Sequence, residues 1–199
     1  IEASAGIGSD SVIPVEIDVT SDASVAAAIE SMGAFSQRLD ILINNAGIYP
    51  EGDERTTELT PAALSRTLET NVVGVHRMIQ ACLPLLKAAP AARIVNVSSG
   101  LGSFEYCAEP DGGFAGYVGT GYGTSKAALN MLTATWAKVF AGTPVRVNAV
   151  SPGWCRTDMG GSGAPRSAAQ GAATLLKYAF LTDDGPNGRF LGGDGVIPW

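Results

Sequence analysis

The chain has 199 residues, 46% of them hydrophobic and only 16% charged, so it can bury one sizeable core and is expected to form a single domain over residues 1–199. Its formal net charge of −6, with no Lys/Arg cluster, argues against nucleic acid or an anionic membrane as a partner. No apolar run reaches the ~18 residues of a membrane span, and three cysteines without metal-ligand or disulfide spacing favour free thiols in a reducing cytoplasm and predict no metal site.

Short apolar runs alternate with longer amphipathic ones along the chain. Thr60 followed by Pro61 is typical of a helix start, because threonine caps the first turn and proline suits the first helical position. In chain order we expect a strand at 12–17, a helix at 23–35, a strand at 41–43, a long helix from Thr60, a strand at 93–97, a helix at 123–140, a strand at 145–150, a helix at 167–180 and a strand at 188–191. The Gly-rich stretch 111–123 is expected to be a surface insertion. The alternation predicts a doubly wound parallel sheet with helices on both faces, a Rossmann-like α/β fold.

Residues 3–8 end in Gly6-Ile7-Gly8 and resemble the tail of a dinucleotide-binding glycine loop. Only nine residues separate Gly8 from Asp18, too few for the helix, strand and second helix that should follow such a loop. The segment is therefore either the end of a helix and its turn, matching by accident, or a real loop joined to later sequence across a gap. Both interpretations imply that the chain lacks the complete first βαβ unit.

Tyr122 and Lys126 form the strongest chemical pattern. They stand four residues apart at the start of the predicted helix 123–140, so their side chains share one face. A nearby ammonium favours the phenolate and should lower the pKa of Tyr122 from its usual value of ~10. Tyr122 can then act as general acid in carbonyl reduction or as general base in alcohol oxidation. Taken alone, this spacing also occurs by chance.

Polar and small residues follow two predicted strands, and ligands bind beyond the carboxyl ends of strands in such a sheet. Ser98 and Ser99 follow 93–97, where a hydroxyl can donate a hydrogen bond to a carbonyl oxygen, although ordinary turn chemistry is the alternative. The run Asn44-Asn45-Ala46-Gly47 follows 41–43, where small residues let a flat cofactor approach.

Two further positions complete the pattern. Asn71 shares a stripe of about 80° on the long helix with apolar side chains, so its amide needs a partner. It is either a satisfied core amide or part of a relay near Lys126. After the strand 145–150, Pro152-Gly153 opens a turn that leads to Thr157, and backbone groups of such a turn can bond a nicotinamide amide.

In their order and joint presence these motifs resemble the short-chain dehydrogenase/reductase family over essentially all 199 residues. The resemblance implies an oxidoreductase that transfers hydride between a nicotinamide cofactor and a carbonyl or alcohol. By the same resemblance Ser99 orients the carbonyl, Tyr122 transfers the proton, Lys126 lowers the tyrosine pKa and binds ribose, and Asn71 completes the relay. It implies a cofactor site formed by Asp18 and Val19 at the adenine, then Asn45, Ala46 and Gly47, Tyr122, Lys126, and Pro152, Gly153 and Thr157.

The chain departs from the family pattern in two places. The glycine loop and the strand after it, which choose between NAD and NADP, are missing, and residues 101–121 widen the gap between Ser99 and Tyr122. The lengthened segment, the run 152–159 and the ending Ile197-Pro198-Trp199 resemble the carbonyl-reductase-like branch, which implies NADP(H) rather than NAD(H) and ketone or aldehyde substrates.

Alternatives remain open at this stage. Instead of an active reductase, the chain can be a non-catalytic Rossmann-like binding or regulatory protein, or an inactive fragment of a reductase. The partner expected is a small carbonyl or alcohol, in the cytoplasm. The sequence does not identify the substrate, the direction of the reaction in vivo or a monomeric or homo-oligomeric state, and a start at Ile1 gives no basis for judging targeting.

Overall fold

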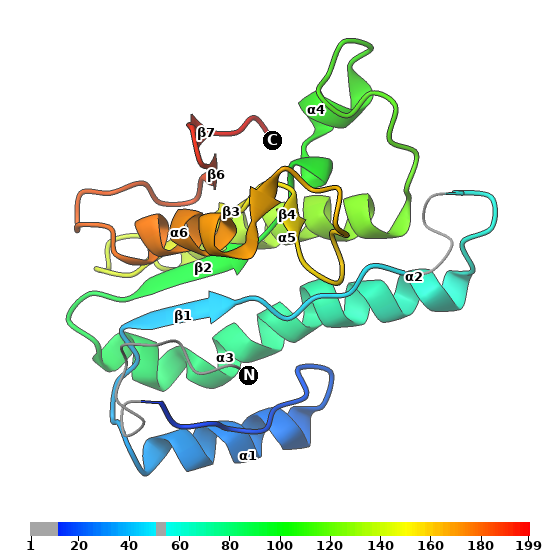
Figure 1. The fold of residues 1–199 in the computed structure, drawn as a ribbon. Coiled ribbons are helices and arrows are strands. Elements are labelled where there is room, and N and C mark those ends of the chain that lie inside the picture. Colours follow the sequence, from blue (N-terminus) through cyan, green and yellow to red (C-terminus); the bar gives the residue numbers. More distant parts are fainter. Residues whose placement is uncertain (1–11, 51–54) are drawn as a thin grey trace.

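The computed structural model describes residues 12–50 and 55–199, and its centre is a five-stranded sheet (Figure 1). The strands lie in the order β1 (Ile41–Asn44), β2 (Arg93–Val97), β3 (Arg146–Val150), β6 (Phe190–Gly192) and β7 (Gly195–Val196). The first four are parallel, and β7 is antiparallel to β6. The predicted parallel sheet is confirmed, whereas residues 3–8 lie outside the described part of the chain.

Helices cover both faces of the sheet, as the alternation of elements predicts. One face carries α3 (Gly74–Ala88) and α5 (Gly121–Val139), and the other carries α6 (Ala168–Ala179) (Figure 1). Ile94 of β2 and Val147 of β3 face the α3–α5 core, whereas Val95, one residue after Ile94, and Val150, three residues after Val147, belong to the α6 core. Successive strand side chains point to opposite faces, so each strand contributes to both cores.

The long helix predicted from Thr60 forms as three consecutive segments, α2 (Pro61–Leu68), a π-helical turn (Glu69–Val73) and α3. Thr60 caps it as expected, because its hydroxyl accepts a hydrogen bond from the Ala63 amide at 3.1 Å. The π-helical turn carries Asn71, which is fully buried. Such turns occur often at functional sites, since the extra residue changes which side chains face inward.

The strand expected at 12–17 is wrong. These residues form neither helix nor strand, and Val12 and Ile13 are 60% and 49% exposed. A strand needs a neighbour that accepts and donates backbone hydrogen bonds, and no described strand lies beside this segment. It leads instead into α1 (Asp22–Gly33), which packs on α3.

Smaller elements surround the carboxyl ends of the strands. The Gly-rich stretch forms mostly exposed turns, as expected, and the α5 helix begins at its end. Five short elements were not predicted from the sequence: a 3-10 turn (Gly100–Gly102), α4 (Phe104–Ala108), the short parallel pair β4 (Cys155–Arg156) and β5 (Arg166–Ser167), and β7.

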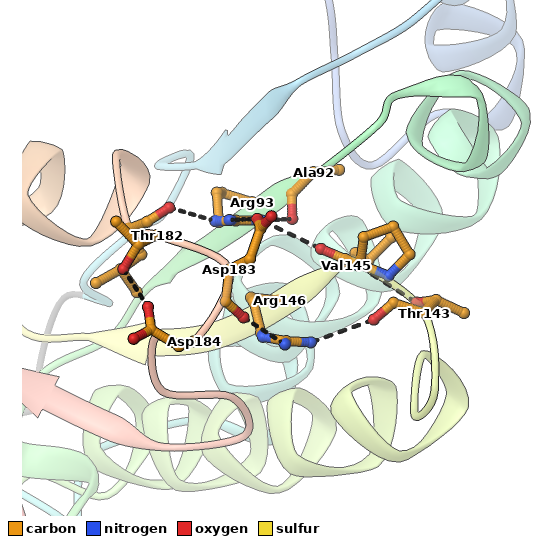
Figure 2. Close-up of polar contacts among 10 residues, drawn as sticks. Ala92, Arg93, Thr143, Val145, Arg146, Thr182, Asp183 and Asp184 are labelled. Atoms are coloured by element: carbon orange, nitrogen blue, oxygen red, sulfur yellow. Dashed lines mark hydrogen bonds and ion pairs between the residues drawn. The ribbon is translucent and has the colours of Figure 1, made fainter.

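Two arginines hold together the opposite, amino-terminal edge of the sheet (Figure 2). Arg93 is 5% exposed, and its guanidinium donates to the carbonyl oxygens of Ala92, Pro144 and Leu181 and pairs with Asp183 at 2.7 Å. Arg146 donates to the carbonyl oxygens of Thr143 and Asp183. This cluster holds the loop after α6 at the amino-terminal ends of the strands, and the polar residues described below lie at the carboxyl ends.

Candidate active site

Tyr122 and Lys126 lie in the first turns of α5, as the sequence predicts. The Lys126 Nζ stands 5.4 Å from the centroid of the Tyr122 ring, so the two side chains share a face. Lys126 is 4% exposed, and its ammonium donates to the Val97 carbonyl oxygen at 2.7 Å. That bond fixes the lysine to the end of β2, beside the serines that follow the strand.

The acid–base properties of this pair differ from the expectation. Burial raises the pKa of Tyr122 to about 12, with a smaller contribution from Tyr49. Burial also lowers the pKa of Lys126 to about 8. The predicted lowering of the Tyr122 pKa by Lys126 is therefore wrong for the chain by itself. The ammonium lies over the ring and bonds to Val97, so desolvation decides both values.

Asn71 connects three segments of the site. Its side-chain oxygen accepts from the Ile48 amide at 2.8 Å, and its nitrogen donates to the Ile48 carbonyl oxygen at 3.0 Å. The same nitrogen donates to Ser125 Oγ at 2.9 Å, and Ser125 Oγ donates to the Tyr122 carbonyl oxygen at 2.7 Å. The amide on the apolar stripe is thus fully paired, and it ties the loop after β1 to the first turn of α5.

Ser98 and Ser99 have different surroundings although they are neighbours. Ser98 is buried and donates to Asn130 Oδ1 at 2.7 Å, so its hydroxyl is used within the core. Ser99 is half-buried and caps the 3-10 turn, its Oγ accepting from the Leu101 amide at 3.2 Å. The turn rests directly on α5, because a Cβ built on Gly102 would meet the Lys126 backbone at 2.6 Å.

The predicted cofactor residues at the end of β1 border a cavity of about 200 Å³, whose described lining includes Val19, Asn45 and Ala46. A Cβ on Gly47 would lie 3.4 Å from Asn71 Oδ1 and 3.6 Å from Lys126 Nζ, so the glycine leaves space between these two groups. A largely apolar cavity beside a glycine without a side chain is the kind of place where a flat ligand can approach the backbone closely.

Asp18 lies in the chain between Ile17 and Val19, which both line this cavity. Its carboxylate accepts from the Thr20 amide at 2.9 Å and from the Thr20 hydroxyl at 2.7 Å, and these bonds lower its pKa. Val19 packs against Gly74, where a Cβ would approach Val19 Cγ2 to 2.9 Å. The glycine of α3 therefore lets the segment around Asp18 sit close to the helix.

The turn after β3 carries the last group of predicted residues. Gly153 has a φ of +77°, which favours glycine, and its amide donates to Ser151 Oγ at 3.3 Å. Thr157 is exposed, and its Oγ1 accepts from the Gly160 amide at 3.1 Å. The turn lies at the carboxyl end of a strand beside β2, so the structure brings it to the same edge of the sheet as Ser99.

Other functional features are not seen in the described ranges. No group of three or more histidine, cysteine or acidic side chains is arranged to hold a metal ion within residues 12–50 and 55–199. No helix in that part of the chain has the length and apolar character needed to cross a membrane. All three cysteines, Cys82, Cys107 and Cys155, are free.

The sequence model of the family described as short chain dehydrogenase matches residues 2–167. The chain belongs to this family. Short-chain dehydrogenase anuI of Penicillium roqueforti is 36% identical over 184 residues, which cover 90% of this chain and 71% of the relative. Carbonyl reductase (NADPH) 1 of Sus scrofa is 30% identical over 221 residues, covering 92% and 75%. The NADPH-bound carbonyl reductase from chicken fatty liver has a TM-score of 0.78 at 32% identity, over 94% of this chain and 77% of that one.

This short-chain dehydrogenase is accordingly an NAD(P)-dependent oxidoreductase with a Rossmann-like fold of the carbonyl-reductase type. Its structure adds two residues that sequence reasoning missed. Ser125, fully buried, relays the Asn71 bond to Tyr122, and its place inside the Tyr122–Lys126 motif was the available signal. Phe114, in the insertion, packs against Gly100, where a Cβ would lie 2.6 Å from its ring. No local pattern indicates that contact.

Proposed function

We propose that this dehydrogenase reduces small to medium carbonyl compounds with NADPH and that Tyr122 donates the proton. The observation that carries the proposal is the pair of Tyr122 and buried Lys126 at the carboxyl edge of a Rossmann-like sheet, with buried Asn71 joined through Ser125 to the Tyr122 carbonyl oxygen. A pKa of about 12 keeps Tyr122 protonated at neutral pH, which suits a proton donor in the direction of reduction. The NADPH preference draws support from the carbonyl reductases that the chain resembles.

Each residue has a defined part in this proposal. Ser99 Oγ donates a hydrogen bond to the substrate carbonyl oxygen and orients it, and the Tyr122 hydroxyl gives its proton to that oxygen as negative charge develops. When bound, the nicotinamide supplies the hydride. The Lys126 ammonium holds the cofactor ribose. Burial dominates the pKa of Tyr122 in the chain by itself, and in this proposal the lysine charge stabilises the phenolate once the proton has left. Asn71 holds the segment around Ile48 next to the first turn of α5, which carries Tyr122.

The proposed cofactor residues follow the edge of the sheet. Asp18 and Val19 border the adenine, and the turn formed by Pro152, Gly153 and Thr157 binds the nicotinamide amide. A third group lines the passage between these ends: Asn45, Ala46 and Gly47, ending at Tyr122 and Lys126. The cavity beside Val19 and the space left at Gly47 support this course. The free cysteines are in keeping with the cytoplasmic location that we also propose.

Tyr122→Phe tests the proposal, with Tyr117→Phe as the matched control because Tyr117 has no lysine four residues later. NADPH and NADH binding is measured by titration, and turnover is measured on a panel of ketones and aldehydes. We expect wild type and both variants to bind NADPH more tightly than NADH, and only Tyr122→Phe to lose turnover, by about 10²-fold or more. Full turnover in Tyr122→Phe would refute its role, and a wild type that binds neither dinucleotide would favour one of the two alternatives, a non-catalytic protein or an inactive fragment of a reductase.

A further inference from the structure

Arg166 lies behind the Pro152–Gly153 turn and is not one of the residues assigned above. It begins β5, which runs parallel to β4 with Arg166 opposite Cys155. Its backbone amide donates to the Trp154 carbonyl oxygen at 3.2 Å. The chain therefore leaves the turn, passes through residues 157–165 and returns, placing the arginine side chain against the segment where it started.

The contact between Arg166 and the turn is direct. A Cβ built on Gly153 would lie 2.7 Å from Arg166 Cδ, a distance that real Cβ contacts do not show, and 3.2 Å from its Nε, which is tighter than most such contacts. The stem of the arginine thus fills the space that a side chain at position 153 would need. Because Gly153 also has a φ of +77°, the conformation of the turn and the position of the arginine depend on each other.

The guanidinium is anchored on the side away from the turn. Its Nη2 donates to the Gln170 carbonyl oxygen and to Thr174 Oγ1 of α6, both at 3.0 Å. A Cβ on Gly193, between β6 and β7, would lie 3.6 Å from Nη1. Its Nε is buried without a hydrogen-bond partner among the described residues. Buried donors in proteins are normally paired, so an unpaired one calls for an explanation. Here the surrounding segments hold the guanidinium in a position where its Nε makes no hydrogen bond.

We propose that Arg166 is a positioning residue for the nicotinamide end of the cofactor, which acts by bracing the Pro152–Gly153 turn against α6. The inference rests on the proposed function, because the turn matters to a ligand only if it binds the nicotinamide amide. The bracing keeps the backbone groups of the turn oriented before the cofactor arrives. Loss of the brace leaves the adenine end untouched, since Val19, Asn45 and Ala46 belong to other segments.

The test compares two ligands that share the adenine end. Dissociation constants are measured by calorimetry for NADPH and for adenosine 2′,5′-bisphosphate, which lacks the nicotinamide half. We expect Arg166→Met to weaken NADPH binding about tenfold, the equivalent of one well-placed hydrogen bond, and to change bisphosphate binding by less than about twofold. Arg166→Lys should lie between wild type and Arg166→Met. Thr174→Val keeps the arginine and removes one of its acceptors. It should weaken the binding of NADPH and leave the binding of the bisphosphate unchanged.

Arg146→Met is the matched control. Arg146 also has a buried Nε without a partner among the described residues, and it braces a loop at the opposite edge of the sheet (Figure 2). We expect it to lower the melting temperature as Arg166→Met does and to leave both dissociation constants unchanged. This control separates a local effect on the turn from a general loss of stability.

The outcomes are distinguishable. The positioning role is overturned, while the proposed function stands, if Arg166→Met and Thr174→Val weaken the binding of both ligands equally or of neither. If wild type binds neither ligand, the proposed function fails and the positioning role fails with it. If the difference between ligands is found but Tyr122→Phe keeps full turnover, Arg166 has its assigned role and the proton donor is another group.

Discussion

Asn71→Ala should release the loop after β1 from α5. Asn71 is fully buried, and its amide makes three hydrogen bonds, two to the backbone of Ile48 and one to Ser125 Oγ. Truncation leaves the Ile48 groups without those partners, whereas Ser125 keeps its bond to the Tyr122 carbonyl oxygen. At a net value of roughly 0.5–1.5 kcal/mol a bond, the loss of three bonds amounts to about 1.5–4.5 kcal/mol. For a chain of this length that lowers the melting temperature by roughly 3–18 °C.

Hydrogen exchange at the Ile48 amide tests the reasoning more sharply than stability alone. The amide is protected by its 2.8 Å bond to Asn71 Oδ1, so Asn71→Ala should speed its exchange far more than the global loss of stability requires. Asn148→Ala is the control, because the hydrogen bonds of this buried amide go to Pro186 and Arg189 instead of Ile48 and Ser125. Asn148→Ala should reduce global stability, and the exchange of the Ile48 amide should speed up only as much as that loss of stability requires.

Two results would refute the argument. One is an Asn71→Ala variant that loses less than about 1 kcal/mol, which would mean that water replaces the amide at no cost. The other is Ile48 exchange that follows global stability equally in both variants. Either result would show that Asn71 does not hold the segment, and its place in the proposed relay would need another basis.

The remaining predictions concern Lys126 and Gly102. Because the pKa of Lys126 falls from 10.5 to about 8 on folding, the unfolded chain binds more protons between these values, so the stability of wild type relative to Lys126→Met should rise from pH 8 to 10.5. Denaturant titrations across this range check it, and a flat difference, or a Met variant that is the less stable one at pH 7, would count against a buried ammonium. Gly102→Ala forces a Cβ to within 2.6–2.8 Å of the α5 backbone, so it should cost about 1–3 kcal/mol and lower kcat/KM at least about tenfold by displacing Ser99. Gly113→Ala, where a Cβ meets nothing within 4 Å, is the control, and equal effects in both variants would exclude steric displacement.

Local patterns were sufficient wherever neighbours in sequence decide the conformation. The Thr60 cap and the strand at 93–97 form as predicted, because capping and apolar periodicity act within a few residues. The four-residue spacing of Tyr122 and Lys126 placed them on one face for the same reason. The position of Asn71 on an apolar stripe likewise indicated a buried amide with a partner, and the structure shows two partners, Ile48 and Ser125.

Tertiary structure decided what depends on contacts between distant segments. The apolar run at 12–17 reads as a strand, yet strand formation requires a neighbour, and no described strand lies there. The pKa of Tyr122 moved in the direction opposite to the expectation, because burial outweighs a charge whose hydrogen bond goes to Val97. Arg166 carries no motif at all. Its proposed role depends on a chain that turns back on itself and places the arginine against Gly153, a contact that residue type and spacing do not encode.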